Sequence, residues 1–294
     1  MKKNGKLKKW IFSLFLLAIL MGTMHSCLQF RMSKSEITSF FADKKQKGKI
    51  ISYKEGFRII NYVIVGDDDK PLVIFVHGSP GSLSAFIDFL GDSSLLSKAQ
   101  LISVDRPGFG YANFGHAEPS LQKQAALLKS VIEKNKNNRP VFLVGHSLGG
   151  PLIARVAMDY PELIDGLIMV APSIDPTLEP HEWFRAPLAT PFLSWILPRS
   201  FRASNDEIYQ LKPELENMLP LWSRVVAPTI VIQGKKDRLV RYENAFFAKE
   251  KMVNALVTLV LVDTMDHFVP WSNPELINST IVDMINHHSK TAKK

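Results

Sequence analysis

The feature that most constrains this chain is a succession of short apolar runs, each separated from the next by a segment with helical spacing. Short runs without polar alternation are typical of strands covered on both faces. Strands that alternate with helices predict a mostly parallel sheet with helices on both sides. The predicted strands, the first of which alternates, lie at residues 57–66, 71–78, 101–108, 140–145, 166–173, 228–234 and 256–263. The predicted helices lie at residues 83–96, 118–137, 148–160, 241–253 and 273–289.

Length and composition exclude several other classes of protein. The 294 residues allow one large α/β domain or two small ones. Hydrophobic residues make up 46% and charged residues 22%, as in soluble globular proteins, which argues against a mainly disordered chain and against a polytopic membrane protein. A single cysteine excludes a disulfide framework and a cysteine-based zinc site.

The positive charge of the chain is concentrated at its ends. The formal net charge is +8, and five lysines precede the first acidic residue within the first nine positions. Without those five the charge is +3, which Lys290, Lys293 and Lys294 account for. The body of the chain carries no basic stripe with interleaved aromatic residues, so we expect no nucleic-acid partner.

The N-terminus resembles an export signal. The five lysines precede an apolar run from Trp10 to Met24, which as a helix would span about 22 Å, short of the ~30 Å hydrocarbon core of a bilayer. Cys27 follows a small residue, Ser26, as in a bacterial lipoprotein cleavage box. We therefore predict a signal peptide over residues 1–26, lipidation of Cys27, a membrane tether over 27–56, and a domain outside the cytoplasm in a bacterial cell envelope. An uncleaved signal anchor and soluble secretion are the alternatives.

One long segment breaks the alternation of strands and helices. Residues 174–222 hold seven prolines and a cluster of aromatic residues. This segment is too long for an ordinary connection between two elements. We predict a lid over a site, with the core made of residues 57–173 and 223–294.

Residues 145–149 carry the sequence G-H-S-L-G, which is a G-x-S-x-G motif placed directly after a predicted strand and directly before a predicted helix. That context is the one in which a serine is exposed on a sharp turn at the end of a strand. The glycines let the backbone pass close to its neighbours, where a Cβ atom would clash. Ser147 is therefore the candidate nucleophile.

The chain resembles the α/β-hydrolase family over nearly all of residues 57–289. Residues 77–81 (HGSPG) are similar to the family's loop after its third strand, and residues 105–110 (DRPGFG) are similar to its turn after the fourth. The resemblance implies an α/β-hydrolase fold with a helical lid inserted before the strand that carries the acid. It also implies that Asp237, in GKKD, is the acid and that His267, in DHFVP, is the base.

The order Ser147, Asp237, His267 is the family order. Asp266 stands where family members usually have glycine. Asp175, which follows the strand before the lid, is an alternative acid because some family members place their acid there.

The roles of these residues follow from their chemistry. A serine hydroxyl needs a base to take its proton as it attacks, and His267 can do this and later protonate the leaving group. Asp237 would hold the other ring nitrogen and stabilise the imidazolium. Leu148 N–H, next to the nucleophile, is one expected oxyanion donor, and by the resemblance Ser79 N–H is the other.

Other residues of the resembling loops have expected structural roles. We expect His77 to brace the oxyanion loop. We expect Asp105 to hydrogen-bond its own turn, with Arg106 as its partner. His146 is expected to be structural or solvated.

These observations predict a serine hydrolase that cleaves a small ester-type substrate through an acyl-enzyme on Ser147. Branches of the family with an Asp nucleophile are excluded. No metal is expected, because the scattered His and Asp residues lack ligand spacing, and no cofactor is expected. Either the lid aromatics line an apolar substrate pocket, formed by Trp183, Phe184 and Trp195, or they fill only the core of the lid.

Two other functions remain open. Residues 77–81 resemble the HGGPG loop of proline iminopeptidases, in which lid carboxylates hold the amine of the substrate, and the lid here has Glu179 and Glu182. The second alternative is an anchored binding protein without turnover.

Overall fold

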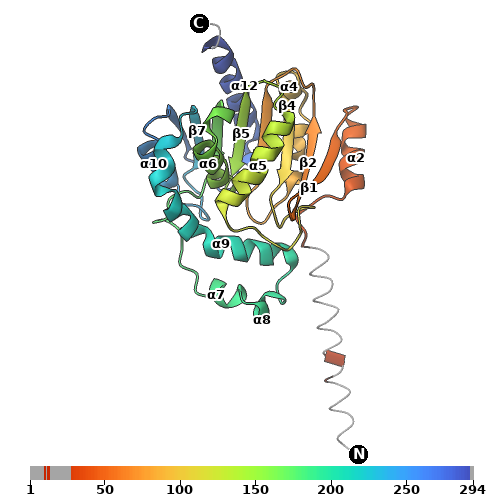
Figure 1. Cartoon of the computed structure of the whole chain (residues 1–294), viewed down its shortest axis with the longest axis vertical. Helices are drawn as coiled ribbons and strands as arrows, with labels where there is room; N and C mark the ends of the chain where they lie inside the picture. Colours follow the sequence, from red (N-terminus) through yellow and green to blue (C-terminus); the bar gives the residue numbers. More distant parts are fainter. Residues whose placement is uncertain (1–9, 11, 14–27, 292–294) are drawn as a thin grey trace, which may run out of the picture.

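The computed structural model describes residues 10, 12–13 and 28–291, and within them one eight-stranded sheet forms the centre of the molecule (Figure 1). The strand order is β1-β2-β4-β3-β5-β6-β7-β8. β1 and β2 run antiparallel to each other, β2 runs antiparallel to β4, and all other neighbours are parallel. The mostly parallel sheet predicted from the sequence is thus confirmed. The strands are β1 (Lys49–Glu55), β2 (Arg58–Val65), β3 (Leu72–Val76), β4 (Gln100–Asp105), β5 (Val141–His146), β6 (Gly166–Val170), β7 (Thr229–Gly234) and β8 (Val257–Val262).

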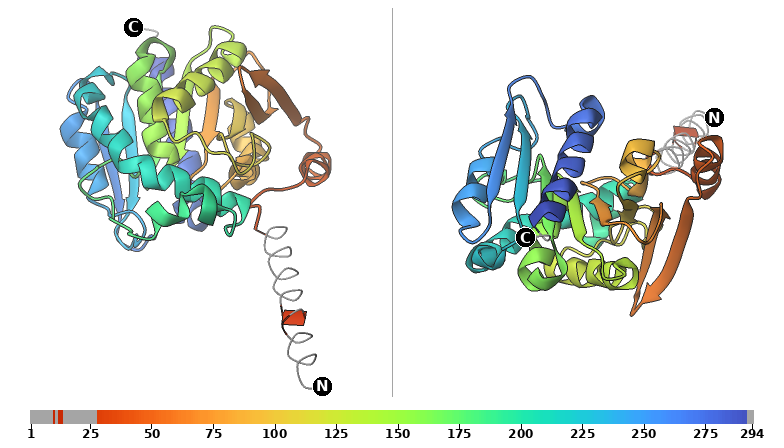
Figure 2. Two further views of the ribbon diagram at one scale, coloured as in Figure 1. Left: turned by 60° about the horizontal axis from the view of Figure 1, so that its bottom comes forward. Right: turned by 90° about the horizontal axis from the view of Figure 1, so that it is seen from above.

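Helices cover both faces of the sheet, as the continuous apolar strands require (Figure 2). Alternate residues of β3 divide between two cores: Ile74 packs with α5, α6 and α10, whereas Phe75 packs with α2, the 83–96 segment and α12. The helices that cover the two faces are α2 (Lys34–Asp43), α5 (Leu121–Asn135), α6 (Gly149–Asp159), α10 (Asn244–Lys251) and α12 (Pro274–Thr291). The short 3-10 helix η2 (Pro161–Leu163) follows α6, and the short α11 (Val269–Ser272) precedes α12.

Two predictions of local structure need correction. The tether predicted over 27–56 contains α2 and the edge strand β1, which pairs along its whole length with β2, so it belongs largely to the folded domain. The single helix predicted over 83–96 is instead the 3-10 helix η1 (Leu83–Phe86) followed by α3 (Ile87–Leu90) and α4 (Ser93–Leu96). The break has a local cause. Gly91 is the C-cap of α3, and the Asp92 carboxylate accepts a hydrogen bond from Leu95 N–H as the N-cap of α4.

The long segment between β6 and β7 forms a separate layer of helices. It contains α7 (Arg185–Leu188), α8 (Pro191–Ser194), the 20-residue α9 (Arg199–Met218) and the 3-10 helix η3 (Leu219–Arg224). α9 crosses the edge of the sheet at which the parallel strands end, and α7 and α8 lie beyond it, at the end of the molecule opposite α12 (Figure 1). Loops at the carboxyl ends of β3, β5, β7 and β8 therefore meet beneath this layer.

Residues 28–33 run from α9 to the start of α2. The hydroxyl of Ser200, in the first turn of α9, donates to the carbonyl oxygen of Leu28. The ring of Phe30 packs edge-on against Phe201, with 5.6 Å between centroids. The guanidinium of Arg31 lies 4.3 Å from the ring centroid of Tyr111. These contacts attach residues 28–31 to the lid and the core.

Within the residues that the structure describes, no helix combines the length and the apolar character needed to cross a bilayer. The predicted signal peptide and Cys27 lie outside the described residues, apart from residues 10 and 12–13.

Candidate active site

Ser147 occupies the sharp turn between β5 and α6. Its φ is +53°, a left-handed conformation that non-glycine residues adopt rarely and at a cost in free energy. The two motif glycines are required by close contacts: a Cβ on Gly145 would lie 2.5 Å from the carbonyl oxygen of Gly149, and a Cβ on Gly149 would lie 2.3 Å from that of Val76. The turn is held in place by a hydrogen bond from Ser147 N–H to Val170 O of β6, 2.9 Å long. The sequence motif therefore forms the predicted turn for the predicted reason.

His267 and Asp237 meet at the ends of the loops after β8 and β7. His267 Nδ1 donates to Asp237 Oδ2 over 2.7 Å, and in the tautomer that makes this bond Nε2 is the ring's acceptor nitrogen. Asp237 Oδ1 also accepts hydrogen bonds from the N–H groups of Leu239 and Val240. Burial favours a higher pKa for Asp237, but the hydrogen bond from His267 and those from the loop outweigh it, so the pKa lies below its usual value. The carboxylate therefore stays ionised at neutral pH.

The alternative acid, Asp175, faces its own turn. Its Oδ1 accepts hydrogen bonds from the N–H and the hydroxyl of Thr177, and its backbone N–H donates to the side chain of Asn244. Of the two candidate acids, the structure brings only Asp237 into hydrogen-bond contact with His267.

The position of His267 is fixed by two neighbours. His146 Nε2 donates to the carbonyl oxygen of His267, and the two rings lie 4.8 Å apart. Burial, followed by the nearby His267, lowers the pKa of His146 to about 3, so this ring is neutral and structural, as expected. Asp266, in the position where the family usually has glycine, is exposed and accepts a hydrogen bond from Phe268 N–H, which closes the turn after the histidine.

The loop after β3 lies directly against Ser147. A Cβ added to Gly78 would lie 2.9 Å from the Cβ of Ser147. Among the hydrogen bonds of the described residues, none is donated by the N–H groups of Ser79 or Leu148, and both residues line the same cavity as Ser147. Two unpaired N–H groups beside a nucleophile can bind a developing oxyanion.

His77 braces this loop, as predicted. Its Nδ1 donates to Gly78 O, and its Nε2 accepts a hydrogen bond from Arg106 N–H. Burial and the adjacent Arg106 hold the pKa of His77 well below its usual value, so the imidazole is neutral. A neutral ring is what this pair of hydrogen bonds needs, since one nitrogen donates and the other accepts.

Asp105 and Arg106 do not form the pair predicted from the sequence. The carboxylate of Asp105 accepts hydrogen bonds from Asn61 and from the N–H groups of Leu83 and Tyr111, so it does hold its own turn. Burial raises the pKa of Asp105 to about 6. Arg106 instead forms an ion pair with Glu207 of α9, and neither side chain is more than 1% exposed.

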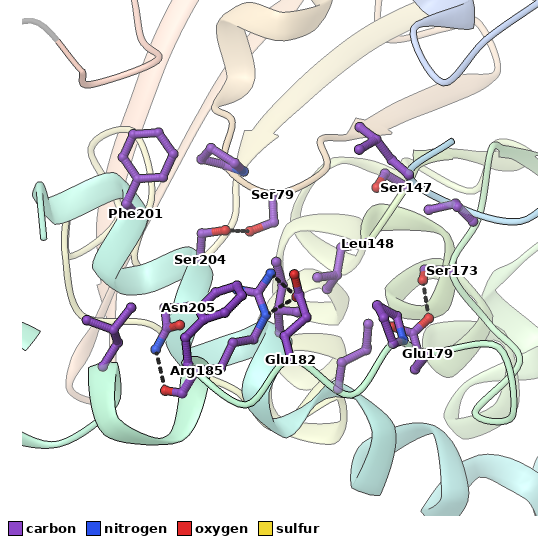
Figure 3. A pocket seen from close by; sticks show the side chains of 18 of the residues that line it. Ser79, Ser147, Leu148, Ser173, Glu179, Glu182, Arg185, Phe201, Ser204 and Asn205 are labelled. Atoms are coloured by element: carbon purple, nitrogen blue, oxygen red, sulfur yellow. Dashed lines mark hydrogen bonds and ion pairs between the residues drawn. The ribbon is translucent and has the colours of Figure 1, made fainter. Parts of the chain in front are cut away.

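This ion pair belongs to a set of contacts between the lid and the oxyanion loop. The Ser79 hydroxyl donates to the Ser204 hydroxyl of α9 over 2.9 Å (Figure 3). The burial of Glu207 raises its pKa, and Arg106 opposes that shift. α9 is therefore joined to the oxyanion loop through Ser204 and, one turn of helix later, to the turn after β4 through Glu207.

Two cavities adjoin Ser147 and His267. One, of about 820 Å³, lies under the lid and is lined on its apolar side by Leu148, Leu188, Leu197, Ile208 and Leu211. The other, of about 560 Å³, lies between the oxyanion loop and the rim residues Phe30, Ala85, Phe268 and Trp271. Both volumes are in the range of small-molecule sites. Ser79, Ser147 and His267 line both, so the reacting groups lie where the two cavities meet.

The polar lining of the cavity under the lid includes two lid carboxylates, Glu179 and Glu182. Glu179 accepts a hydrogen bond from Ser173, and Glu182 pairs with Arg185 (Figure 3). Burial raises the pKa of Glu179. The predicted aromatic pocket is only partly present, because Phe184 lines this cavity, whereas Trp183 and Trp195 are absent from its lining and are 77% and 55% exposed.

The sequence analysis missed the contribution of α9. Ser204 and Glu207 lie on its buried face, together with Ala203 and Leu211, which lie four residues before and four residues after Glu207, as on one side of a helix. An acidic residue on the apolar face of an amphipathic helix is a signal that it has a buried partner. In residues 28–291, no group of three or more His, Cys, Asp or Glu side chains is placed to hold a metal ion.

Comparison with known proteins agrees with this architecture. The model of a family described as alpha/beta hydrolase fold matches residues 71–199, from β3 to the start of α9. Together with the sheet topology, this match identifies the chain as a protein of the α/β-hydrolase fold.

Particular relatives are distant. Mouse monoglyceride lipase is 24% identical over 181 residues, which are 51% of this chain and 58% of that protein. Proline iminopeptidase from Lactobacillus helveticus is 30% identical over 112 residues, which are 37% of this chain and 38% of that protein. The crystal structure of a bacterial membrane phospholipase A has a TM-score of 0.65 and 16% identity, covering 98% of this chain and 99% of that one, which shows a shared fold.

Proposed function

We propose that this protein is a serine hydrolase that cleaves small ester-type substrates through an acyl-enzyme on Ser147. The observation that carries the proposal is that Ser147 and the Asp237-bound His267 line the same cavity, beside the unpaired N–H groups of Ser79 and Leu148. A nucleophile, a base oriented by a carboxylate, and oxyanion donors are the parts that acyl transfer needs.

The reaction has two halves, acylation of Ser147 and hydrolysis of the acyl-enzyme, and His267 transfers protons in both. Ser147 Oγ attacks the carbonyl carbon while His267 Nε2 takes its proton, and the N–H groups of Ser79 and Leu148 stabilise the oxyanion. His267 then gives that proton to the leaving oxygen as the C–O bond breaks, which releases an alcohol and leaves the acyl group on Ser147. Water, deprotonated by His267, hydrolyses the acyl-enzyme and restores the serine.

The two cavities support an ester with a substituent on each side of the carbonyl group. Because Ser147 lies where they meet, one can hold the acyl chain and the other the alcohol. The apolar lining of both cavities supports an acyl substrate, and the likeness to monoglyceride lipase supports the same class.

We also propose that the protein is attached to a membrane of a bacterial cell envelope. The lysine-rich first nine residues, the apolar run from Trp10 to Met24, and Cys27 support this attachment. In this proposal the folded domain lies outside the cytoplasm.

The first test is Ser147→Ala. We expect kcat for p-nitrophenyl esters of short and medium acyl chains to fall by roughly 10⁴–10⁶-fold, because the triad acts as a unit. A fluorophosphonate probe should label the wild-type protein and the control variant Ser97→Ala, whose exposed serine lies on the surface, but not Ser147→Ala. More than a tenth of wild-type activity in Ser147→Ala would show that another residue is the nucleophile.

A proline-iminopeptidase-like aminopeptidase is the alternative, and the two lid carboxylates in the cavity favour it. Glu179 and Glu182 both line the cavity with Ser147, where a carboxylate could bind a substrate amine. Prolyl and alanyl arylamides assayed beside the ester panel separate the two functions. Faster cleavage of prolyl arylamides, lost in Glu179→Gln, would favour the aminopeptidase. A folded protein that neither turns over substrate nor reacts with the probe would be the anchored binding protein.

A further inference from the structure

The part of the lid around α7 and α8, which lie beyond α9 (Figure 1), exposes several large apolar side chains. Trp183 is 77% exposed, Phe192 80%, Trp195 55% and Ile196 45%, all within fourteen residues of the chain. Neither α7 nor α8 has a buried residue. We call these four side chains the lid face. Large apolar side chains that gather on a surface mark an interaction site, and tryptophan is enriched where a protein meets the boundary of a bilayer.

The N-terminal part of the chain joins the molecule beside this lid. Leu28 lines the cavity under the lid, and its carbonyl oxygen accepts from Ser200 in the first turn of α9. Phe30 packs on Phe201, and Arg31 donates to Gly110 O and lies over Tyr111. The place where the chain enters the folded domain is thus fixed, next to the lid.

Chain length then limits how far the lid can lie from any bilayer that holds the N-terminus. The apolar run ends at Met24, four residues before Leu28. Four residues span at most about 14 Å when fully extended. A bilayer that holds residues 10–24 would therefore have its surface within that distance of Leu28. If the segment is cleaved and Cys27 is lipidated, the bilayer holds the residue directly before Leu28, so the distance is shorter still.

The segment that carries the lid face is locally basic. Residues 183–202 include Arg185, Arg199 and Arg202 and no carboxylate, and of the three only Arg185 is in an ion pair among the described residues, with Glu182. Arginines next to exposed tryptophans favour a surface with anionic headgroups.

We propose that the lid face docks on the lipid bilayer that holds the N-terminal segment, with Trp183, Phe192, Trp195 and Ile196 in contact with lipid. The inference rests on the membrane attachment proposed above and is independent of the proposed hydrolysis. It gives the molecule a fixed orientation, in which the lid faces the bilayer and α12, at the opposite end, faces away from it (Figure 1).

The test uses the full-length protein in vesicles of phosphatidylcholine and phosphatidylglycerol with brominated acyl chains, which quench nearby tryptophans. All proteins carry Trp10→Phe, so that the N-terminal segment does not contribute. We expect quenching that disappears when Trp183→Phe and Trp195→Phe are added, since these conservative changes keep the lid face apolar. The remaining Trp222 is only 1% exposed, and Trp271 lies at the rim of the site.

The matched control adds Val253→Trp to the protein that lacks Trp10, Trp183 and Trp195. Val253 is exposed just before β8, at the edge of the sheet opposite the lid, so we expect no quenching. Equal quenching of this control would overturn the proposed orientation. Absence of quenching in protein that floats with the vesicles would overturn the docking, as would dimers that bury the lid face. Failure to float would overturn the membrane attachment, and ester hydrolysis, measured separately, would be unaffected by any of these results.

Discussion

At the scale of single residues, the two candidate acids differ in what their carboxylates bind. Asp237 accepts from His267 as well as from its own loop, whereas Asp175 accepts only from Thr177 among the described residues. Both follow a strand of the same sheet, so sequence position alone did not separate them. The direction of the loop after each strand decides which carboxylate reaches the imidazole.

We expect Asp237→Asn to lower kcat by roughly 10⁴-fold, because an amide cannot hold the histidine in the tautomer that accepts the serine proton. Asp175→Asn should keep activity close to wild type, since an amide oxygen can still accept from Thr177. Steady-state kinetics of both variants with one p-nitrophenyl ester make the comparison. The opposite ranking would assign the acid to Asp175.

Much of the candidate site could be predicted because its signals are local. Ser147 lies in a motif with a strand before it and a helix after it, and His77 lies next to the loop that it braces. The Arg106–Glu207 pair had no such signal, because its partners are 101 residues apart and Asp105 is the nearer carboxylate along the chain. Asp105 is not available to Arg106, since three donors from other segments bind it.

At the scale of elements, too, features with a local sequence signal were predicted and features that depend on distant contacts were not. The buried strands were found from their continuous apolar runs. β1 was missed because it is an edge strand whose residues are mostly exposed or half-exposed, so it has no continuous apolar run. It is held by its backbone pairing with β2, which the sequence pattern does not reveal. The lid was recognised from its length and its prolines, but the 20-residue α9 within it was not predicted as a helix, and it contains Pro213.

α9 does more than cover the cavity, because it carries one half of a buried ion pair. Removing one partner of such a pair leaves an uncompensated charge, which typically costs 3–5 kcal/mol. We expect Glu207→Ala to lower the free energy of unfolding by about that amount, measured by denaturation in guanidinium chloride. The double variant Arg106→Met/Glu207→Leu should recover most of the loss, since apolar side chains can replace a buried pair. An unchanged unfolding free energy in Glu207→Ala would show that the pair contributes nothing to stability.

At the scale of the whole molecule, exposed apolar surface lies beside the point where the N-terminal part of the chain enters the domain. Five lysines precede the apolar N-terminal run, and the lid face lies beside the place where that part of the chain enters the domain. The predicted lipidation of Cys27 concerns the residue immediately before Leu28.

We expect Cys27→Ser to release the protein from the membrane fraction or to block its processing, because the acyl chains of a lipoprotein are attached to that cysteine. Fractionation of cells and mass spectrometry of the protein measure the two effects. Trp10→Phe, which leaves Cys27 intact, serves as the control. An unchanged distribution and an unchanged mass in Cys27→Ser would rule out the lipoprotein, with the uncleaved anchor as the remaining form of attachment.

The contacts of Leu28, Phe30 and Arg31 fix the chain to the folded domain from residue 28 onward, so no free linker separates residue 27 from the domain. If the proposed anchor holds the chain at residue 27, the domain would stay next to the bilayer surface. For a substrate that partitions into that bilayer, turnover would then depend on its mole fraction in the surface rather than on its bulk concentration.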